Sequence, residues 1–141
     1  MSVLGKTALG LAVSSMAAVT VGAGFASAEA GPDGRYYGSM AVEVVDGKAH
    51  TIWATDYPSW EESDASALGR CVSGHCSVIV RFVDGCGSIA VKNGSMIGRS
   101  APSKAEAERA AIDAFGPPVA SLSAAPVQAS ILQTACTHNA G

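Results

Sequence analysis

The sequence has few charged residues, and they are never clustered. Lys, Arg, Asp and Glu make up 15% of the 141 residues, no charged run exceeds two residues, and the formal net charge is −3. Nucleic acids and anionic membranes are bound through clustered Lys and Arg side chains. The absence of such a cluster argues against both as partners.

The chain also lacks an apolar run long enough to cross a bilayer. Residues 8–21 form its main apolar stretch, which is rich in small residues and shorter than the roughly 20 residues that a span needs. Lys6 precedes this stretch, and Ala26-Ser27-Ala28 follows it with small residues suited to a signal-peptidase site. This order is typical of a secretory signal peptide. We therefore expect residues 1–28 to be removed on export, after Ala28 or, as second choice, after Ala30.

Removal of the peptide would leave 113 of the 141 residues, which is the size of one domain. Residues 29–35 are rich in Gly, Pro, Asp and Glu and are predicted to be a flexible leader. Residues 36–141 are predicted to fold as a single domain. The mature protein is expected outside the cell, either secreted or associated with the cell envelope, without stable membrane insertion.

The exported part of the sequence contains two copies of the same pattern. Gly38-Ser39-Met40-Ala41-Val42 recurs as Gly87-Ser88-Ile89-Ala90-Val91, and Pro58-Ser59-Trp60-Glu61-Glu62 recurs in outline as Pro102-Ser103-Lys104-Ala105-Glu106. Each Pro-Ser segment begins a helix with a Ser N-cap and a Glu three residues later, which is a capping box. The sequence thus predicts two ββαβ repeats, residues 36–83 and 86–136, in an α+β fold.

Turn signals divide the predicted strands. Strands are expected at 36–45, 51–55, 76–83, 86–92, 95–100 and 127–135, and helices from Ser59 to about Leu68 and from Ser103 to about Phe115. Asp46-Gly47, Asp84-Gly85 and Asn93-Gly94 are hairpin signals, because Asx and Gly tolerate positive φ. Asp56-Tyr57-Pro58 is expected to end the second strand. We expect an antiparallel sheet or a half-open barrel with two short covering helices, related by a pseudo-twofold axis.

Four cysteines lie in the exported part, and their even number predicts two disulfides. Three pairings are possible, and the sequence does not choose among them. The favoured pairing joins Cys71 to Cys76 across a short loop and Cys86 to Cys136, which would tie the fourth strand to the last.

The ordered motifs resemble those of a known family. Tyr37-Gly38, Pro58-Ser59-x-x-Glu62, Cys71, Cys76 and Asp84-Gly85-Cys86-Gly87, followed by a second capped helix, resemble the small secreted proteins of domain of unknown function 4189 (DUF4189), common in mycobacteria and related actinobacteria. The resemblance implies a secreted two-repeat α+β domain and carries no catalytic residues. Some mycobacterial members are thought to act as exported factors at the host interface. The family often ends its second helix with Cys, whereas this chain has Phe115 there.

Aromatic residues are few and are concentrated near the start of the domain. Tyr36, Tyr37, Tyr57 and Trp60 are a candidate binding patch, because Tyr and Trp provide contact area at little entropic cost. Tyr36 and Tyr37 must point to opposite sheet faces, so one of them is expected outside the core. The favoured alternative is structural: Trp53 and Trp60 would fill a core otherwise made of Ala, Gly and Val.

Other sites are weaker candidates. Cys71, His75 and Cys76, with Cys136 and His138, offer zinc ligands, but their spacing fits no C-x-x-C pair and exported thiols oxidise. If the cysteines form disulfides, we expect His75 to be an exposed loop residue and His138 to belong to a frayed tail.

Catalytic and inhibitory roles also have little support. No Gly-x-Ser-x-Gly elbow is present. The acidic residues at the first helix, Asp56, Glu61, Glu62 and Asp64, are better explained by the helix dipole than by glycosidase chemistry. The loop between Cys71 and Cys76 is the single candidate for a protease-inhibitor loop.

The interpretation that follows is an exported domain, not an enzyme, that binds a protein or glycan and needs no cofactor or metal. The alternative is a small secreted hydrolase or metal-dependent enzyme that uses the Cys/His or acidic cluster. A homodimer could also form through an edge strand, expected to be the one bearing Tyr37.

Overall fold

The computed structural model describes residues 29–118 and 127–141, so the predicted signal peptide lies outside the described residues. The chain follows the ββαβ order twice, as predicted. The elements are β1 (Tyr37–Val45), β2 (Lys48–Tyr57), α1 (Trp60–Gly69), β3 (Ser77–Val83), β4 (Cys86–Lys92), β5 (Ser95–Ala101), α2 (Lys104–Asp113) and β6 (Ser130–Cys136). The α+β class with two short helices is therefore confirmed.

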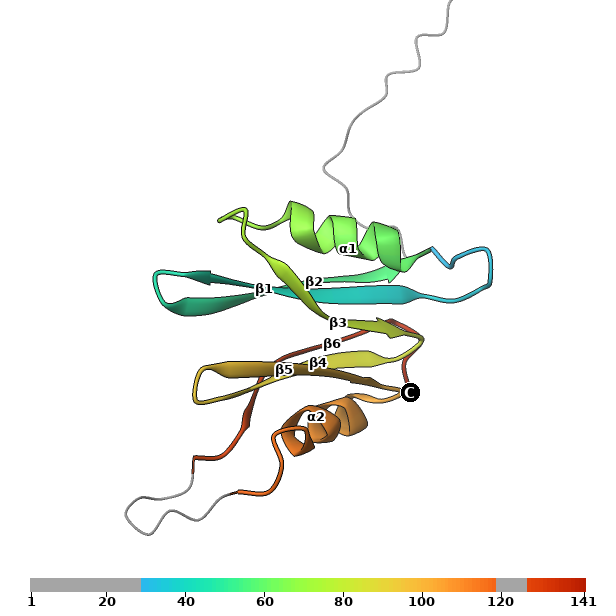
Figure 1. Ribbon diagram of the computed structural model, residues 1–141. Helices are drawn as coiled ribbons and strands as arrows, with labels where there is room; N and C mark the ends of the chain where they lie inside the picture. The colour runs from blue at the N-terminus through green and yellow to red at the C-terminus, as the bar shows by residue number, and fades with distance from the viewer. Residues whose placement is uncertain (1–28, 119–126) are drawn as a thin grey trace, which may run out of the picture.

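In the described ranges, the strands form two separate antiparallel sheets of three strands each. Their orders are β2-β1-β3 and β5-β4-β6. The sheets stack on each other, with α1 covering the outer side of the first and α2 covering the outer side of the second (Figure 1). The single sheet or half-open barrel that we expected is replaced by four layers, helix, sheet, sheet and helix.

The β3–β4 connection explains this division. Asp46-Gly47 and Asn93-Gly94 make tight hairpins, with φ of 52° and 74° in the first and 50° and 78° in the second. Asp84 has a φ of 46°, but Gly85 is not in the positive-φ region, and the turn carries the chain from one sheet to the other. The prediction of a hairpin at Asp84-Gly85 was wrong. A Cβ atom on Gly85 would lie 2.5 Å from the Ala101 carbonyl oxygen, so this crossing requires glycine.

The two repeats share an irregularity as well as their order. The β1–β3 register shifts between Met40 and Ala41, where β3 has the extra residue Ile79. The β4–β6 register shifts between Ile89 and Ala90, where β6 has the extra residue Leu132. β3 contacts β5 and β2 contacts β6, which are the two contacts that a twofold exchange of the repeats would interconvert. These two contacts follow the exchange expected of a pseudo-twofold relation, whereas the contact of β3 with β4 belongs to the direct connection between the repeats.

The core between the sheets is centred on Phe82, which is 2% exposed and packs with Met40, Val80 and Ile89. Gly38 and Gly87, at equivalent positions of the two repeats, lie against its ring. A Cβ atom on Gly38 would approach the Phe82 ring to 2.4 Å, and one on Gly87 to 2.5 Å. The recurring Gly-Ser segment thus provides space for one aromatic ring shared by the repeats.

Each helix packs through small residues, as its composition predicts. Ser63 and Ala67 are the buried residues of α1, and Ala107 and Ala111 are those of α2. Both predicted N-caps are present. The Ser59 hydroxyl accepts the Glu62 backbone N–H, and the Ser103 hydroxyl accepts that of Glu106. The small side chains allow a close approach to the sheet, which supplies most of the stability of such short helices.

Three expectations about individual strands and side chains need correction. Trp53 and Trp60 are each 42% exposed, so neither fills the core. The strand that carries Tyr37 is central in its sheet, so a dimer through its edge is not available; the edges are β2 and β3. β2 does not end at Thr55 but runs to Tyr57, because Asp56 takes a φ of 64° at a register shift opposite Tyr37–Ser39.

None of the helices in the described ranges has the length and hydropathy of a membrane span.

Candidate functional site

Tyr37 and Trp60 form the wall of an open pocket at the end of the first sheet. Tyr37 is the first residue of β1 and Trp60 the first of α1, so the strand start and the helix start bring the rings together. The ring centroids are 5.3 Å apart with an interplanar angle of 85°, which is an edge-to-face pair. The pocket has a volume of about 440 Å³. Its lining residues are Pro32, Asp33, Tyr37, Pro58, Ser59, Trp60 and Glu61. We call it the Tyr37–Trp60 pocket.

The polar groups of both rings are engaged within the protein. The Trp60 indole N–H donates to the Phe82 carbonyl oxygen at 3.2 Å. The Tyr37 hydroxyl donates to the Asp33 carboxylate. These bonds fix the orientation of the two rings that line the pocket.

The lining charges of the Tyr37–Trp60 pocket are both negative. The hydrogen bond from Tyr37 lowers the pKa of Asp33 below its usual value and raises the pKa of Tyr37. Glu61 is the second acid, and no Lys, Arg or His is among the lining residues. The pocket therefore combines aromatic ring surface with two carboxyl groups.

A second hollow, of about 390 Å³, adjoins Trp60 and has a different character. It is lined by Arg35, Trp60, Arg81, Phe82, Val83, Asp84, Ser100, Ala101 and Pro102. Both arginines are paired, Arg35 with Asp84 at 3.0 Å and Arg81 with Asp64 at 2.5 Å.

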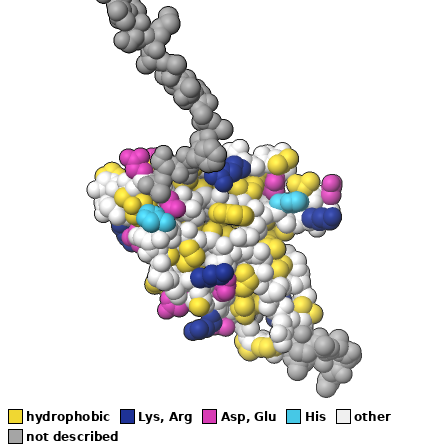
Figure 2. All heavy atoms as spheres, turned by 180° about the vertical axis from the view of Figure 1, so that it is seen from behind, with side chains coloured by type: hydrophobic (Ala, Val, Ile, Leu, Met, Phe, Trp, Pro, Cys, Tyr) yellow, Lys and Arg dark blue, Asp and Glu magenta, His cyan; other side chains and the backbone are white. Residues whose placement is uncertain are grey.

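The face drawn in Figure 2 shows basic and acidic side chains interspersed, in agreement with the absence of charge runs in the sequence.

The predicted aromatic patch divides into separate parts. Tyr37 and Trp60 share the pocket. Tyr36 packs against His138, with ring centroids 4.1 Å apart, and the Tyr57 hydroxyl lies 2.6 Å from that of Ser66 on α1. Tyr36 and Tyr57 are thus engaged by the fold, and the candidate site is narrower than the sequence indicates.

The cysteines pair as favoured from the sequence, Cys71 with Cys76 and Cys86 with Cys136. No cysteine is free, and all four lie in the described residues. The proposed Cys/His zinc cluster therefore has no thiolate in this state, and a cysteine nucleophile is likewise absent.

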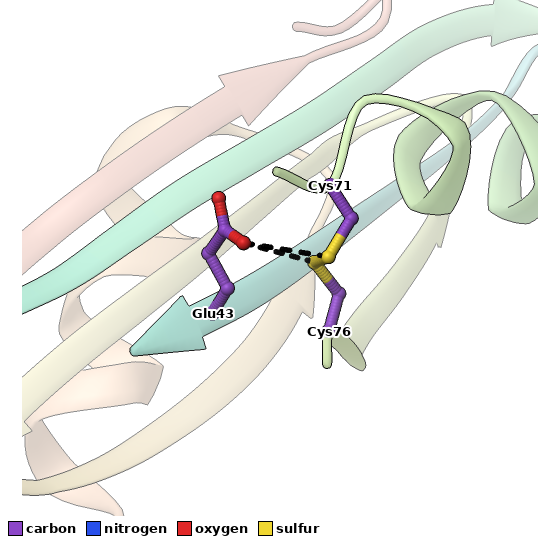
Figure 3. A group of neighbouring side chains, drawn as sticks. All are labelled: Glu43, Cys71 and Cys76. Carbon is purple, nitrogen blue, oxygen red and sulfur yellow. Dashed lines mark hydrogen bonds between the residues drawn. A yellow bond between two sulfur atoms is a disulfide. The ribbon is translucent and has the colours of Figure 1, made fainter. Parts of the chain in front are cut away.

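Glu43 lies against the first disulfide although it is only 4% exposed (Figure 3). Its carboxylate accepts the backbone N–H of Ser73 at 2.8 Å and that of Val72 at 3.4 Å, and the first of these bonds is the main cause of its lowered pKa. Its Oε2 atom is 3.4 Å from the Cys71 sulfur and 3.8 Å from that of Cys76. Because the sulfurs of a disulfide carry no hydrogen, the two oxygen–sulfur approaches are close contacts and not hydrogen bonds.

His138 is not part of a frayed tail, which corrects our expectation. Its backbone N–H donates to the Asp56 carboxylate at 2.9 Å, and its ring Nδ1 lies 3.1 Å from the same oxygen. Asp64 accepts hydrogen bonds from Arg81 on β3. Asp56 and Asp64 thus serve separate structural contacts, while Glu61 lines the pocket.

The sequence did not reveal Asp33, Glu43 and Asp84 as important residues. Asp33 lies in the predicted flexible leader, and its contact with Tyr37 depends on the path of that leader. Glu43 stands in an apolar strand, where a single acid could have been flagged as an exception to the burial pattern. Asp84 was interpreted only as a turn residue, and the sequence did not indicate that its carboxylate would bind distant segments.

The chain matches the model of the family described as Domain of unknown function (DUF4189) over residues 37–136 and belongs to that family. Comparison with curated proteins and with solved structures gives no match.

Proposed function

We propose that this protein is an exported domain, not an enzyme, that acts by binding a protein or glycan outside the cell through the Tyr37–Trp60 pocket. The observation that carries the proposal is the open pocket lined by Tyr37 and Trp60, whose rings are held by internal hydrogen bonds while Trp60 stays 42% exposed. Rings fixed in advance bind with little loss of conformational entropy, which favours a role in recognition.

The pocket chemistry favours a protein ligand that presents Lys or Arg. A cation is attracted to the face of an aromatic ring, and most strongly to that of Trp. Asp33 and Glu61 add negative charge on the same lining, which has no basic residue to oppose it. A neutral glycan would use the rings and leave this charge unpaired.

Export is supported by the signal-peptide pattern of residues 1–28 and by the two disulfides, since such bridges persist in oxidising compartments. Intact mass of the protein recovered from the culture medium tests this directly. We expect a chain that begins after Ala28 or Ala30 and that gains four hydrogens on reduction. A full-length chain retained inside the cell would contradict export.

Binding is tested with printed arrays of peptides and glycans, probed with the wild-type protein and two variants. Trp60→Ala should lose the wild-type signals. Trp53→Ala is a matched control, because Trp53 has the same 42% exposure and does not line the pocket. Signals on Lys- or Arg-containing peptides that only Trp60→Ala removes would support the proposal. Binding that both variants retain, or no binding, would contradict it, and loss on glycans alone would overturn the protein preference.

A further inference from the structure

Glu43, Cys71 and Cys76 bring three zinc-type donors together from separate parts of the first repeat. Glu43 is on β1, Cys71 follows α1 and Cys76 precedes β3. A carboxylate oxygen and the two sulfurs all lie within 4.8 Å of one another (Figure 3). In the disulfide state the two sulfurs are bonded to each other and cannot bind a metal as thiolates.

The distances suit a tetrahedral metal site. With Zn–S bonds of about 2.3 Å and a Zn–O bond of about 2.0 Å, the oxygen–sulfur edge of a tetrahedron is about 3.5 Å. The two distances from Glu43 Oε2 to the sulfurs, 3.4 and 3.8 Å, bracket this value. The sulfurs would have to move apart to about 3.8 Å. The Cα atoms are 6.0 Å apart on either side of a short loop, which permits this by side-chain rotation.

The surroundings of Glu43 would also support a metal. The backbone N–H groups of Val72 and Ser73 already hold its carboxylate in place. Outer hydrogen bonds of this kind orient ligating carboxylates and strengthen metal binding. The four residues between Cys71 and Cys76 are within the spacing used by structural zinc sites.

We propose that reduction of the Cys71–Cys76 disulfide creates a zinc site whose protein ligands are Glu43, Cys71 and Cys76, with water in the fourth position. A dithiol reductant supplies two electrons, leaves two cysteine thiols and becomes a disulfide itself. Zn²⁺ then binds without electron transfer, and the two thiol protons pass to solvent. In the reduced chain the metal replaces the disulfide as the link between Cys71 and Cys76, and it adds a bond from both to Glu43 on β1.

The second disulfide provides an internal contrast. Cys86 and Cys136 are directly paired on β4 and β6, with their Cα atoms 4.0 Å apart. Within the residues that the structure describes, this pair belongs to no group of three close metal donors. Its reduction should therefore create no comparable site.

The experiment measures zinc binding by the full exported chain before and after reduction with a phosphine, which takes up oxygen from water as it is oxidised. Zinc affinity is obtained by competition with a colorimetric chelator. We expect one zinc per reduced chain and none per oxidised chain. The reduced Cys71→Ala/Cys76→Ala variant, which keeps the second cysteine pair, should bind none.

Glu43→Gln tests the third ligand, with Glu62→Gln on the exposed part of α1 as the matched control. Glu43→Gln should weaken zinc binding about tenfold or more, and Glu62→Gln should leave it unchanged. Cobalt absorption spectra of the reduced wild type provide a second measurement that needs no substitution, because cobalt–thiolate bands report the sulfur ligands. Equal zinc binding by the oxidised and reduced chains, no effect of Glu43→Gln, or a cobalt spectrum without thiolate bands would overturn the proposal.

Discussion

Asp84 connects three segments that are distant in the sequence. Its carboxylate accepts the Tyr36 backbone N–H at 2.9 Å, the Asn139 side-chain amide at 3.0 Å and the Arg35 guanidinium at 3.0 Å. These interactions, with the Tyr36 N–H as the largest cause, lower the pKa of Asp84 to about 2. One side chain at the turn between the repeats thus holds both the entry to β1 and the C-terminal segment.

The lowered pKa predicts a dependence of stability on pH. The folded pKa of about 2 lies below the ordinary value of 3.8, so ionised Asp84 stabilises the fold above pH 3.8. This contribution should be lost as the pH falls from about 4 to about 2. Asp84→Asn tolerates the positive φ and removes the charge, so its Tm should fall less steeply over this range. Thermal unfolding followed by circular dichroism at several pH values measures this, and parallel wild-type and variant curves would contradict it.

At the scale of the element, local sequence signals predicted most of the fold. The two Ser N-caps and the tight hairpins at Asp46-Gly47 and Asn93-Gly94 depend on hydrogen bonds and backbone angles within a few residues, so they can be recognised without tertiary structure. The sheet crossing at Asp84-Gly85 could not be predicted in this way, because Asx-Gly occurs in it as it does in a hairpin. The continuation of β2 through Asp56 depends on its pairing with β1, which lies outside the local segment.

The N-cap of α2 offers a prediction at this scale. Ser103 accepts the Glu106 backbone N–H and donates to the Glu106 carboxylate at 2.7 Å. Ser103→Ala removes both bonds and should lower the free energy of unfolding by about 1 kcal/mol. Denaturant unfolding measures the change, with exposed Ser100→Ala on β5 as a control expected to stay within about 0.5 kcal/mol. An equal effect of the two substitutions would show that the cap contributes nothing specific.

At the scale of the whole molecule, the repeats are joined by packing around one shared ring. Phe82 belongs to the first repeat, yet its ring contacts Gly87 of the second. The sequence predicted the repeats and the disulfide framework, but it did not show which residue would lie between the sheets. The sequence indicated Tyr37 and Trp60 as pocket residues but not Pro32 and Asp33. The approach of Pro32 and Asp33 to Tyr37 depends on the path of residues 29–35 over the folded domain, which is again tertiary structure.

Phe82→Ala tests this central packing. Removal of the ring leaves a cavity between the sheets, and the free energy of unfolding should fall by about 3–5 kcal/mol. Val72→Ala is the control, because Val72 is 86% exposed and its truncation should change stability by no more than about 0.5 kcal/mol. Denaturant unfolding of both variants provides the measurement. A loss for Phe82→Ala as small as that for Val72→Ala would mean that the sheets do not depend on this ring.

The proposed function depends on recognition of a cationic group by the Tyr37–Trp60 pocket. The chain has two tryptophans with equal exposure, of which only Trp60 lines the pocket. Their two indole N–H signals in an NMR spectrum, assigned with Trp53→Ala and Trp60→Ala, therefore report the pocket and an internal control together.

The most direct measurement is a titration of the wild-type protein with N-acetyl-lysine N-methylamide, and in parallel with the uncharged norleucine analogue. If the pocket recognises a cation, the lysine compound shifts the Trp60 indole signal, the norleucine compound shifts it much less, and the Trp53 signal stays in place. Equal shifts with both compounds, equal shifts of both tryptophans, or no shift of Trp60 would show that the pocket does not recognise the cationic group.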